Sequence, residues 1–169
     1  MPRPAESTSE VPTLVHLADE KDTEKIRNGG IRIRKNGTGV FCMPVLPNFY
    51  VSHQWLRELK RWGATTFVGV YFKVASSEIV YAGRYNHEHR RMSLGEAIRE
   101  IMALEDARGY ELIVDRKIEP KEIARIRHLP QDIGWRYFPG SNTKKPCACE
   151  YCMKGMFKGK KTRLRLNPD

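Results

Sequence analysis

Hydrophobic positions recur along the chain in short runs with two different periods, separated by glycine, proline and polar residues. Alternation with a period of two predicts strands over residues 13–17, 31–34, 39–43, 65–74, 78–82, 109–114 and 134–138. A spacing of three or four predicts helices over residues 21–27, 51–62 and 93–107, and a further helix from about residue 121. Residues 31–34 and 39–43 are expected to pair as a hairpin, while 83–92 reads as a polar loop. Strands and helices are interspersed without regular βαβ spacing, so the expected class is α+β.

One predicted strand carries a carboxylate among apolar residues. In 109–114, Tyr110, Leu112 and Val114 share one face, whereas Glu111 and Ile113 lie on the other. A carboxylate next to buried residues is costly unless it has a partner or a function. From the pattern alone, Glu111 is either a solvated residue of an edge strand or part of a site.

Length and composition bound the architecture. The 169 residues, 40% of them hydrophobic, suffice for one domain, or for one domain with an appendage. Residues 1–11 predict a disordered tail, 12–140 the domain and 141–169 a Cys-rich basic extension. The N-terminus lacks the apolar core of a secretory signal, and the apolar runs are too short to span a membrane. We therefore expect a cytoplasmic protein that does not contact a membrane.

Cysteine spacing suggests a metal site. Three of the four cysteines, Cys147, Cys149 and Cys152, have the spacing C-x-C-x-x-C, which suits a structural zinc in a reducing compartment better than a disulfide framework. Cys42 is the only remaining thiol for the fourth position. The alternatives are a histidine ligand (His87, His89 or His128) or a set of free thiols.

The net charge of +10 favours an acidic partner, either a nucleic acid or an anionic dinucleotide. Basic residues follow the cysteines and are candidates for binding phosphates: Lys154, Lys158, Lys160, Lys161, Arg163 and Arg165. The alternative is a solvated tail.

Two blocks of the sequence resemble the ADP-ribosyltransferase superfamily. The strand of Glu111 followed by Ile118-Glu119-Pro120-Lys121-Glu122-Ile123 is similar to the family's last block, and residues 14–18 around His16 are similar to its first. The resemblance implies an ADP-ribosyltransferase-like fold of split mixed or antiparallel sheets with flanking helices. It also implies that Glu111 orients the nicotinamide ribose of NAD and assists transfer.

The resemblance further implies a set of NAD contacts. His16 would bind the adenosine ribose, and the backbone beside it, at Leu17, would pair with the nicotinamide amide. The family often has a Ser-Thr-Ser strand end after its aromatic wall, which this sequence lacks. Phe41, Tyr50 or Trp55 would therefore supply the ring that stacks on nicotinamide.

The expected function is NAD-dependent transfer of ADP-ribose to an acceptor, with nucleic acid, DNA or RNA, as the expected one. Gly109 stands where clades that modify arginine often carry a second Glu or Gln. In lacking that residue, the sequence most resembles toxin-type enzymes that target nucleic acids. The alternatives are a non-enzymatic zinc-dependent nucleic-acid-binding protein and an RNA 2′-phosphotransferase-like enzyme. A toxin, a defence factor and a housekeeping modifier are all open.

Overall fold

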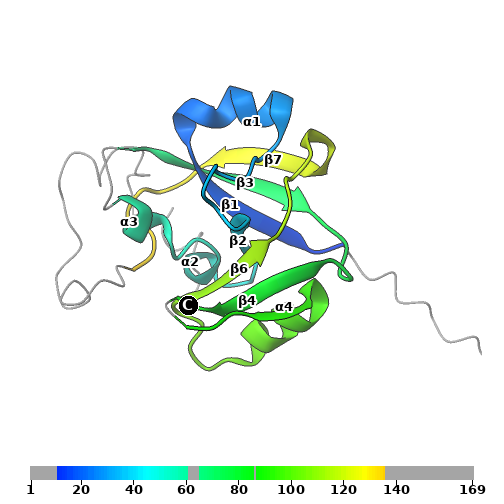
Figure 1. Cartoon of the computed structure of the whole chain (residues 1–169). Coiled ribbons are helices and arrows are strands. Elements are labelled where there is room, and N and C mark those ends of the chain that lie inside the picture. Colours follow the sequence, from blue (N-terminus) through cyan, green and yellow to red (C-terminus); the bar gives the residue numbers. More distant parts are fainter. Residues whose placement is uncertain (1–10, 61–64, 86, 136–169) are drawn as a thin grey trace, which may run out of the picture.

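The chain forms an α+β structure around an antiparallel sheet (Figure 1). A computed structural model describes residues 11–60, 65–85 and 87–135. In these residues the sheet has seven strands in the order β5-β4-β6-β2-β1-β3-β7. The strands are β1 (Thr13–Asp19), β2 (Val40–Pro44), β3 (Phe67–Lys73), β4 (Ile79–Arg84), β5 (Arg90–Ser93), β6 (Tyr110–Val114) and β7 (Ile123–His128). The helices are α1 (Thr23–Gly29), α2 (Phe49–Ser52), α3 (Leu56–Leu59) and α4 (Leu94–Ala103), with 3₁₀ turns η1 (Glu20–Asp22) and η3 (Pro120–Glu122).

The sheet divides into two halves that meet at β1 and β2. On one side β1 pairs with β3 over its whole length, and β3 pairs with β7. On the other side β2 pairs with β6, which pairs with β4. Between the halves only Leu14↔Pro44 and Val15↔Met43 are in register, and beyond these pairs the two strands separate. This separation opens the space in which the candidate site lies.

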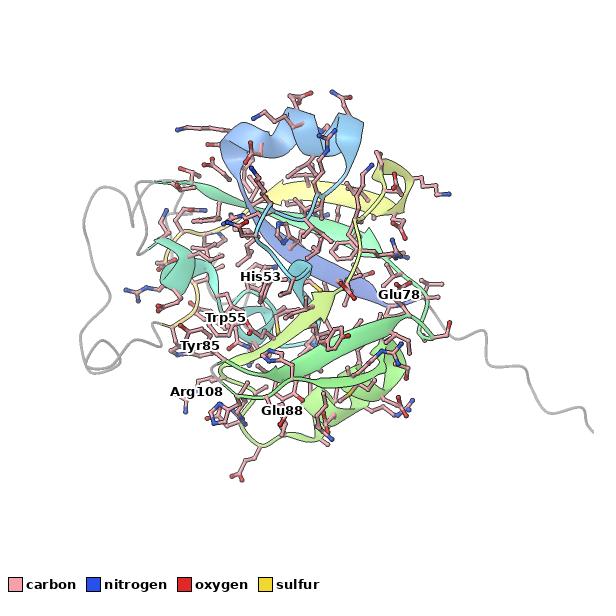
Figure 2. All side chains as sticks on the ribbon, in the orientation of Figure 1. His53, Trp55, Glu78, Tyr85, Glu88 and Arg108 are labelled. Atoms are coloured by element: carbon pink, nitrogen blue, oxygen red, sulfur yellow. The ribbon has the colours of Figure 1, made fainter. Side chains whose placement is uncertain are left out.

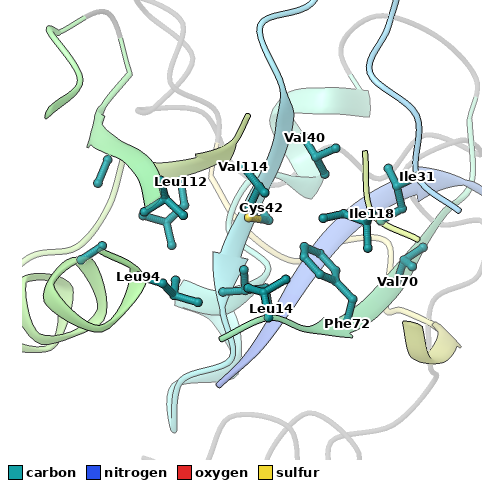
Figure 3. Close-up of a cluster of buried hydrophobic side chains, with 14 of the residues drawn as sticks. Leu14, Ile31, Val40, Cys42, Val70, Phe72, Leu94, Leu112, Val114 and Ile118 are labelled. Atoms are coloured by element: carbon teal, nitrogen blue, oxygen red, sulfur yellow. The ribbon is translucent and has the colours of Figure 1, made fainter. Parts of the chain in front are cut away.

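Each face of the sheet carries its own apolar layer. The larger cluster includes Leu14, Val40, Phe72 and Leu112 (Figure 3), and α4 adds Leu94, Ala97 and Ile101 to it. On the other face, Val15, Met43 and Tyr71 form a smaller cluster with Leu17, Val51 and Trp55. The segment of α2 and α3 thus covers the second face, while α4 lies along β4 and β5 (Figure 1).

Several sequence predictions are confirmed. The strand of Glu111 is β6, and Tyr110, Leu112 and Val114 are buried on one of its faces. Ser93 caps α4 with a capping box in which Glu96 bonds back to the Ser93 backbone. The α+β class is likewise as expected, and all strand pairings in the described residues are antiparallel.

Four predicted elements are wrong: one hairpin, two helices and one loop. The predicted hairpin does not form, because both edges of β2 are occupied by β1 and β6. The predicted helix over 51–62 is two single-turn helices, α2 and α3, within its described part. The predicted loop over 83–92 includes the end of β4 and most of β5, and the helix expected after Pro120 is one 3₁₀ turn that leads into β7. In each case pairing between distant segments overrode the local pattern.

A tight contact fixes the segment that follows α1. Ile31 forms an isolated bridge with Ile118, with backbone hydrogen bonds of 2.9 and 3.0 Å. Figure 3 shows the two side chains in the same core. Gly30, with φ of 75°, brings the backbone so close that a Cβ would lie 2.0 Å from the Ile118 carbonyl oxygen. The bridge holds the start of residues 31–39 against the η3 region.

Most of the predicted N-terminal tail, the whole of 141–169 and most of the strand predicted over 134–138 lie outside the described residues. Gly134 and Trp135, which are described, are not in a strand. Among the described helices, none has the length and apolar character needed to cross a lipid bilayer.

Candidate functional site

A cavity of about 350 Å³ lies where the two halves of the sheet separate. This volume falls in the range of roughly 300–1,000 Å³ that is usual for small-molecule sites. Its lining comes from β1, residues 31–39, β2, the α2–α3 segment, Tyr85 and β6. Among the lining residues are His16, Leu17, Phe41, Trp55 and Glu111. Five residues to which the resemblance assigns the same ligand therefore border one space.

His16 spans the gap between the two separating strands. Its ring nitrogen Nδ1 donates a hydrogen bond of 2.7 Å to the Phe41 carbonyl on β2. Burial lowers the pKa of His16, and the positive charge of Arg34 lowers it further, whereas the bond to Phe41 opposes the shift. A neutral ring with its proton on Nδ1 leaves Nε2 as an acceptor at the cavity. Such an acceptor suits a hydroxyl group of a ligand.

Because the resemblance implies that His16 contacts NAD, His16→Ala is expected to weaken NAD binding about 5- to 30-fold, the loss of a hydrogen bond of about 1–2 kcal/mol. It should change turnover at saturating NAD much less, because His16 has no charge to offer the reacting carbon. Calorimetric titration with NAD measures the affinity. An affinity equal to that of the wild type would leave His16 only the structural task of joining β1 to β2.

Glu111 projects from β6 into the same cavity and is largely buried. Its side chain is 13% exposed, and its Oε1 lies 3.0 Å from Nε2 of His89, which is 18% exposed. Burial raises the pKa of the Glu111 carboxyl, and the charge of His89 and its hydrogen bond oppose that shift. A buried carboxylate with a raised pKa and one specific partner is typical of a functional group.

Two neighbouring residues of the α2–α3 segment anchor the start of β6. The Gln54 side chain, fully buried, accepts from the Gly109 amide at 2.7 Å and donates to the Ala107 carbonyl at 3.0 Å. Trp55 Nε1 donates to the Tyr110 carbonyl at 2.9 Å. These bonds fix the backbone immediately before Glu111. Nothing in the sequence pattern pointed to Gln54 in this role.

The structure distinguishes among the three aromatic candidates. Trp55 and Tyr85 lie side by side with ring centroids 5.7 Å apart, and both line the cavity (Figure 2). Phe41, 45% exposed, borders it from β2. Tyr50 is not one of the lining residues, and its ring lies near Trp135 instead. Trp55 and Phe41 thus border the cavity and Tyr50 does not, while the choice of the ring that stacks on nicotinamide stays a prediction.

Two arginines from the segment after α1 also line the cavity. Arg32 and Arg34 belong to residues 31–34, which were predicted as a strand but have no strand partner beyond Ile31. Neither guanidinium forms an ion pair with another residue in the described part of the chain. They give one wall of the cavity a positive charge that suits phosphate groups. The sequence pattern predicted only a hairpin strand here and no ligand contact for either arginine, so this role was missed.

Cys42 lies in the apolar core and also borders the cavity. It is 5% exposed, and it packs with Val40, Val114 and Leu14 (Figure 3). Burial raises the pKa of its thiol well above the usual range. Both ring nitrogens of His89, an alternative fourth ligand, form hydrogen bonds. The three cysteines that would share the metal lie outside the described residues, so the choice of the fourth ligand stays a prediction.

The remaining metal and nucleic-acid predictions fall outside the described residues. These are Cys147, Cys149 and Cys152, and the basic residues Lys154, Lys158, Lys160, Lys161, Arg163 and Arg165. Within the described segments, no group of three or more His, Cys, Asp or Glu side chains is arranged to hold a metal ion. The zinc site and the nucleic-acid-binding residues stay predictions.

Glu111→Gln is expected to make the folded protein more stable than the wild type at neutral pH. The raised pKa means that the folded state binds the proton of Glu111 more tightly than the unfolded chain does. Stability from this group is therefore lost as pH rises from the ordinary glutamate pKa, near 4.3, through the raised value. Gln removes that loss, so the difference in the free energy of unfolding between variant and wild type should shrink below a pH of about 4.

Urea denaturation of both proteins, at neutral pH and at a pH of about 4, measures this difference. Lower stability of the variant at neutral pH would mean that the attraction between Glu111 and His89 outweighs the cost of burying the carboxylate.

Comparisons of the chain with protein-family models, with curated proteins and with solved structures found no match.

Proposed function

We propose that the protein is an NAD-dependent ADP-ribosyltransferase with an ADP-ribosyltransferase-like fold. One observation carries the proposal: His16, Leu17, Phe41, Trp55 and Glu111 border a single cavity, although they come from segments up to 95 residues apart, from position 16 to position 111. The split of the antiparallel sheet at β1 and β2 supports the same proposal, because it creates that cavity.

The cavity offers a suitable group for each part of NAD. The acceptor Nε2 of His16 suits a ribose hydroxyl, and the guanidinium groups of Arg32 and Arg34 suit the pyrophosphate. The indole of Trp55 provides a flat face for the nicotinamide next to Glu111. Stacking of a positively charged pyridinium on such a ring contributes about 1 kcal/mol or more when water is excluded.

The chemical step would use the charge of Glu111. The bond between the ribosyl C1′ and the nicotinamide nitrogen breaks, and nicotinamide departs with the electron pair. The Glu111 carboxylate stabilises the positive charge that develops on the ribose. The nucleophile of the acceptor then bonds to C1′, and its proton passes to Glu111 or to water.

The acceptor is proposed to be nucleic acid, on the strength of the net charge of +10. Incubation with labelled NAD and a panel of DNA, RNA and proteins tests both parts of the proposal. Label on an acceptor in the wild type, with free nicotinamide released, supports transfer. If NAD is neither bound nor cleaved, the proposal fails and a non-enzymatic nucleic-acid-binding protein becomes the better account.

A second candidate, an RNA 2′-phosphotransferase-like enzyme, is favoured by one observation. Arg32 and Arg34 line the same cavity as His16, and arginines beside a histidine suit a phosphate on an RNA ribose. RNA with one internal 2′-phosphate, incubated with NAD, separates the two candidates. Loss of the phosphate from RNA supports the second candidate, whereas label from NAD on RNA without such loss supports the first.

A further inference from the structure

The carboxylate of Glu111 has a histidine partner that comes from a different part of the chain. His89 lies in the turn between β4 and β5, and its Nε2 reaches Oε1 of Glu111 at 3.0 Å. Within the described residues, this is the only hydrogen bond of the Glu111 side chain, so Oε2 has no protein partner there. Because Glu111 also lines the cavity, one oxygen is held by the protein while the other is available to a ligand.

The hydrogen bonds of His89 define the protons in this pair. Its Nδ1 lies 3.0 Å from the His87 carbonyl oxygen, which can only accept, so Nδ1 carries a proton. The contact between Nε2 and Oε1 then needs one more proton, on either atom. The pair is an imidazolium with a carboxylate, or an imidazole with a carboxylic acid. The charge of Glu111 is therefore linked to the charge of His89: Glu111 is ionised when the shared proton lies on His89, and neutral when it lies on Oε1.

The backbone makes room for this contact at Gly83. Gly83 on β4 is in register with Glu111 on β6, so the two positions are directly opposite. A Cβ at Gly83 would lie 3.0 Å from the Glu88 carbonyl oxygen and 3.2 and 3.3 Å from Cα and Cγ of His89. The missing side chain at Gly83 thus leaves the space that the His89 ring occupies as it crosses β4 towards Glu111.

The arginines on either side of the turn that carries His89 are engaged elsewhere. Arg84 donates to the carbonyls of Asp106 and Arg108, at 2.7 and 2.6 Å. Arg90 forms an ion pair with Glu100 on α4. His87 is exposed, and its Nδ1 bonds to the Tyr85 carbonyl. The electrostatic environment of Glu111 therefore depends mainly on its burial and on His89.

We propose that His89 is the positioning residue for Glu111: it holds Oε1, keeps the carboxylate ionised and leaves Oε2 facing the bound ribose. The effect of His89 on catalysis rests on the proposed function. The effect of His89 on the ionisation of Glu111 can be tested without an activity assay. His89 would not touch NAD or the acceptor. It would set the pH below which the enzyme stops working, because transfer requires the carboxylate.

The first test follows the Glu111 carboxyl directly. Protein with ¹³C at glutamate Cδ is titrated by NMR, and the Glu111 signal is assigned by its absence in Glu111→Gln. In His89→Ala the carboxyl should lose its proton at a higher pH than in the wild type, since the opposing charge is gone. Gly83→Ala should shift the titration in the same direction by pushing the ring away. His87→Ala, in the same turn, is the control and should leave it unchanged.

The second test uses transfer itself. His89→Ala should lower kcat at neutral pH on the order of tenfold, as for loss of a charge-assisted hydrogen bond, and move the acid limb of the pH profile upward. KM for NAD should change little. His89→Gln, which can place a neutral N–H near Oε1, should recover part of kcat.

The two tests separate the two proposals. If the Glu111 carboxyl titrates alike in the wild type, His89→Ala and Gly83→Ala, the positioning role of His89 is wrong, whatever the activity. If the titration shifts as expected but the wild type transfers nothing from NAD, the pairing holds and the proposed function fails. A fall in kcat without any shift of the acid limb would also contradict the positioning role.

Discussion

Glu111→Gln is expected to lower the rate of ADP-ribose transfer by about 10² or more while NAD affinity stays close to that of the wild type. The amide keeps the size of the side chain and can still bond to His89, so the cavity keeps its shape. It lacks the negative charge that stabilises the ribosyl cation as nicotinamide leaves. The effect should therefore fall on kcat and not on binding.

Single-turnover release of nicotinamide and calorimetric binding of NAD measure the two quantities separately. Glu88→Gln is the matched control. Glu88 is exposed in the turn next to His89, and its substitution by Gln removes the same charge from the protein. That control should behave as the wild type. If Glu111→Gln keeps near wild-type turnover, Glu111 has no part in the chemistry and the proposed mechanism is wrong.

Gly30→Ala is expected to destabilise the fold by about 3 kcal/mol or more. Gly30 has φ of 75° and ψ of −174°, a conformation that is essentially restricted to glycine. The added Cβ would lie 2.0 Å from the Ile118 carbonyl oxygen, which is backbone and cannot move alone. Relief of this clash should break the bridge between Ile31 and Ile118, and with it the placement of Arg32 and Arg34 at the cavity.

The neighbouring glycine provides the control. Gly29 ends α1, and a Cβ there would meet only the Arg32 guanidinium at 3.4 Å, an ordinary contact. Gly29→Ala should therefore be neutral, or more stable by about 0.5–1 kcal/mol through helix propensity. Urea denaturation of both variants tests the contrast. Equal effects of the two substitutions would show that the close approach at Gly30 does not constrain the fold.

Local sequence was a good guide where one element satisfies its own requirements. The alternation in 109–114 predicted β6 and the faces of Tyr110 and Glu111, because a strand buried on one side must place apolar residues at every second position. Ser93 and Glu96 predicted the start of α4, since a capping box needs only residues that are three positions apart.

Local sequence failed where the outcome depends on which partner is available. Ile31-Arg32-Ile33-Arg34 has the alternation of a strand, yet only Ile31 pairs, because β2 already lies between β1 and β6. Residues 51–62 have helical spacing, but His53 and Gln54 are buried there. The His53 side chain forms a hydrogen bond with Tyr71, and the Gln54 side chain forms one with the backbone at the start of β6. Competition among distant segments decided both cases.

By itself, the sequence determined that the protein is α+β, that β6 carries a carboxylate beside its core, and which residues were candidates for binding NAD. Tertiary structure alone decided that His16 and Glu111 border one cavity, that two arginines join them, that Cys42 is buried between the core and that cavity, and that His89 bonds to Glu111. The physical reason is range. Periodicity and capping act over a few residues, whereas strand order, register and the space left by Gly83 arise only when segments far apart in the chain pack together.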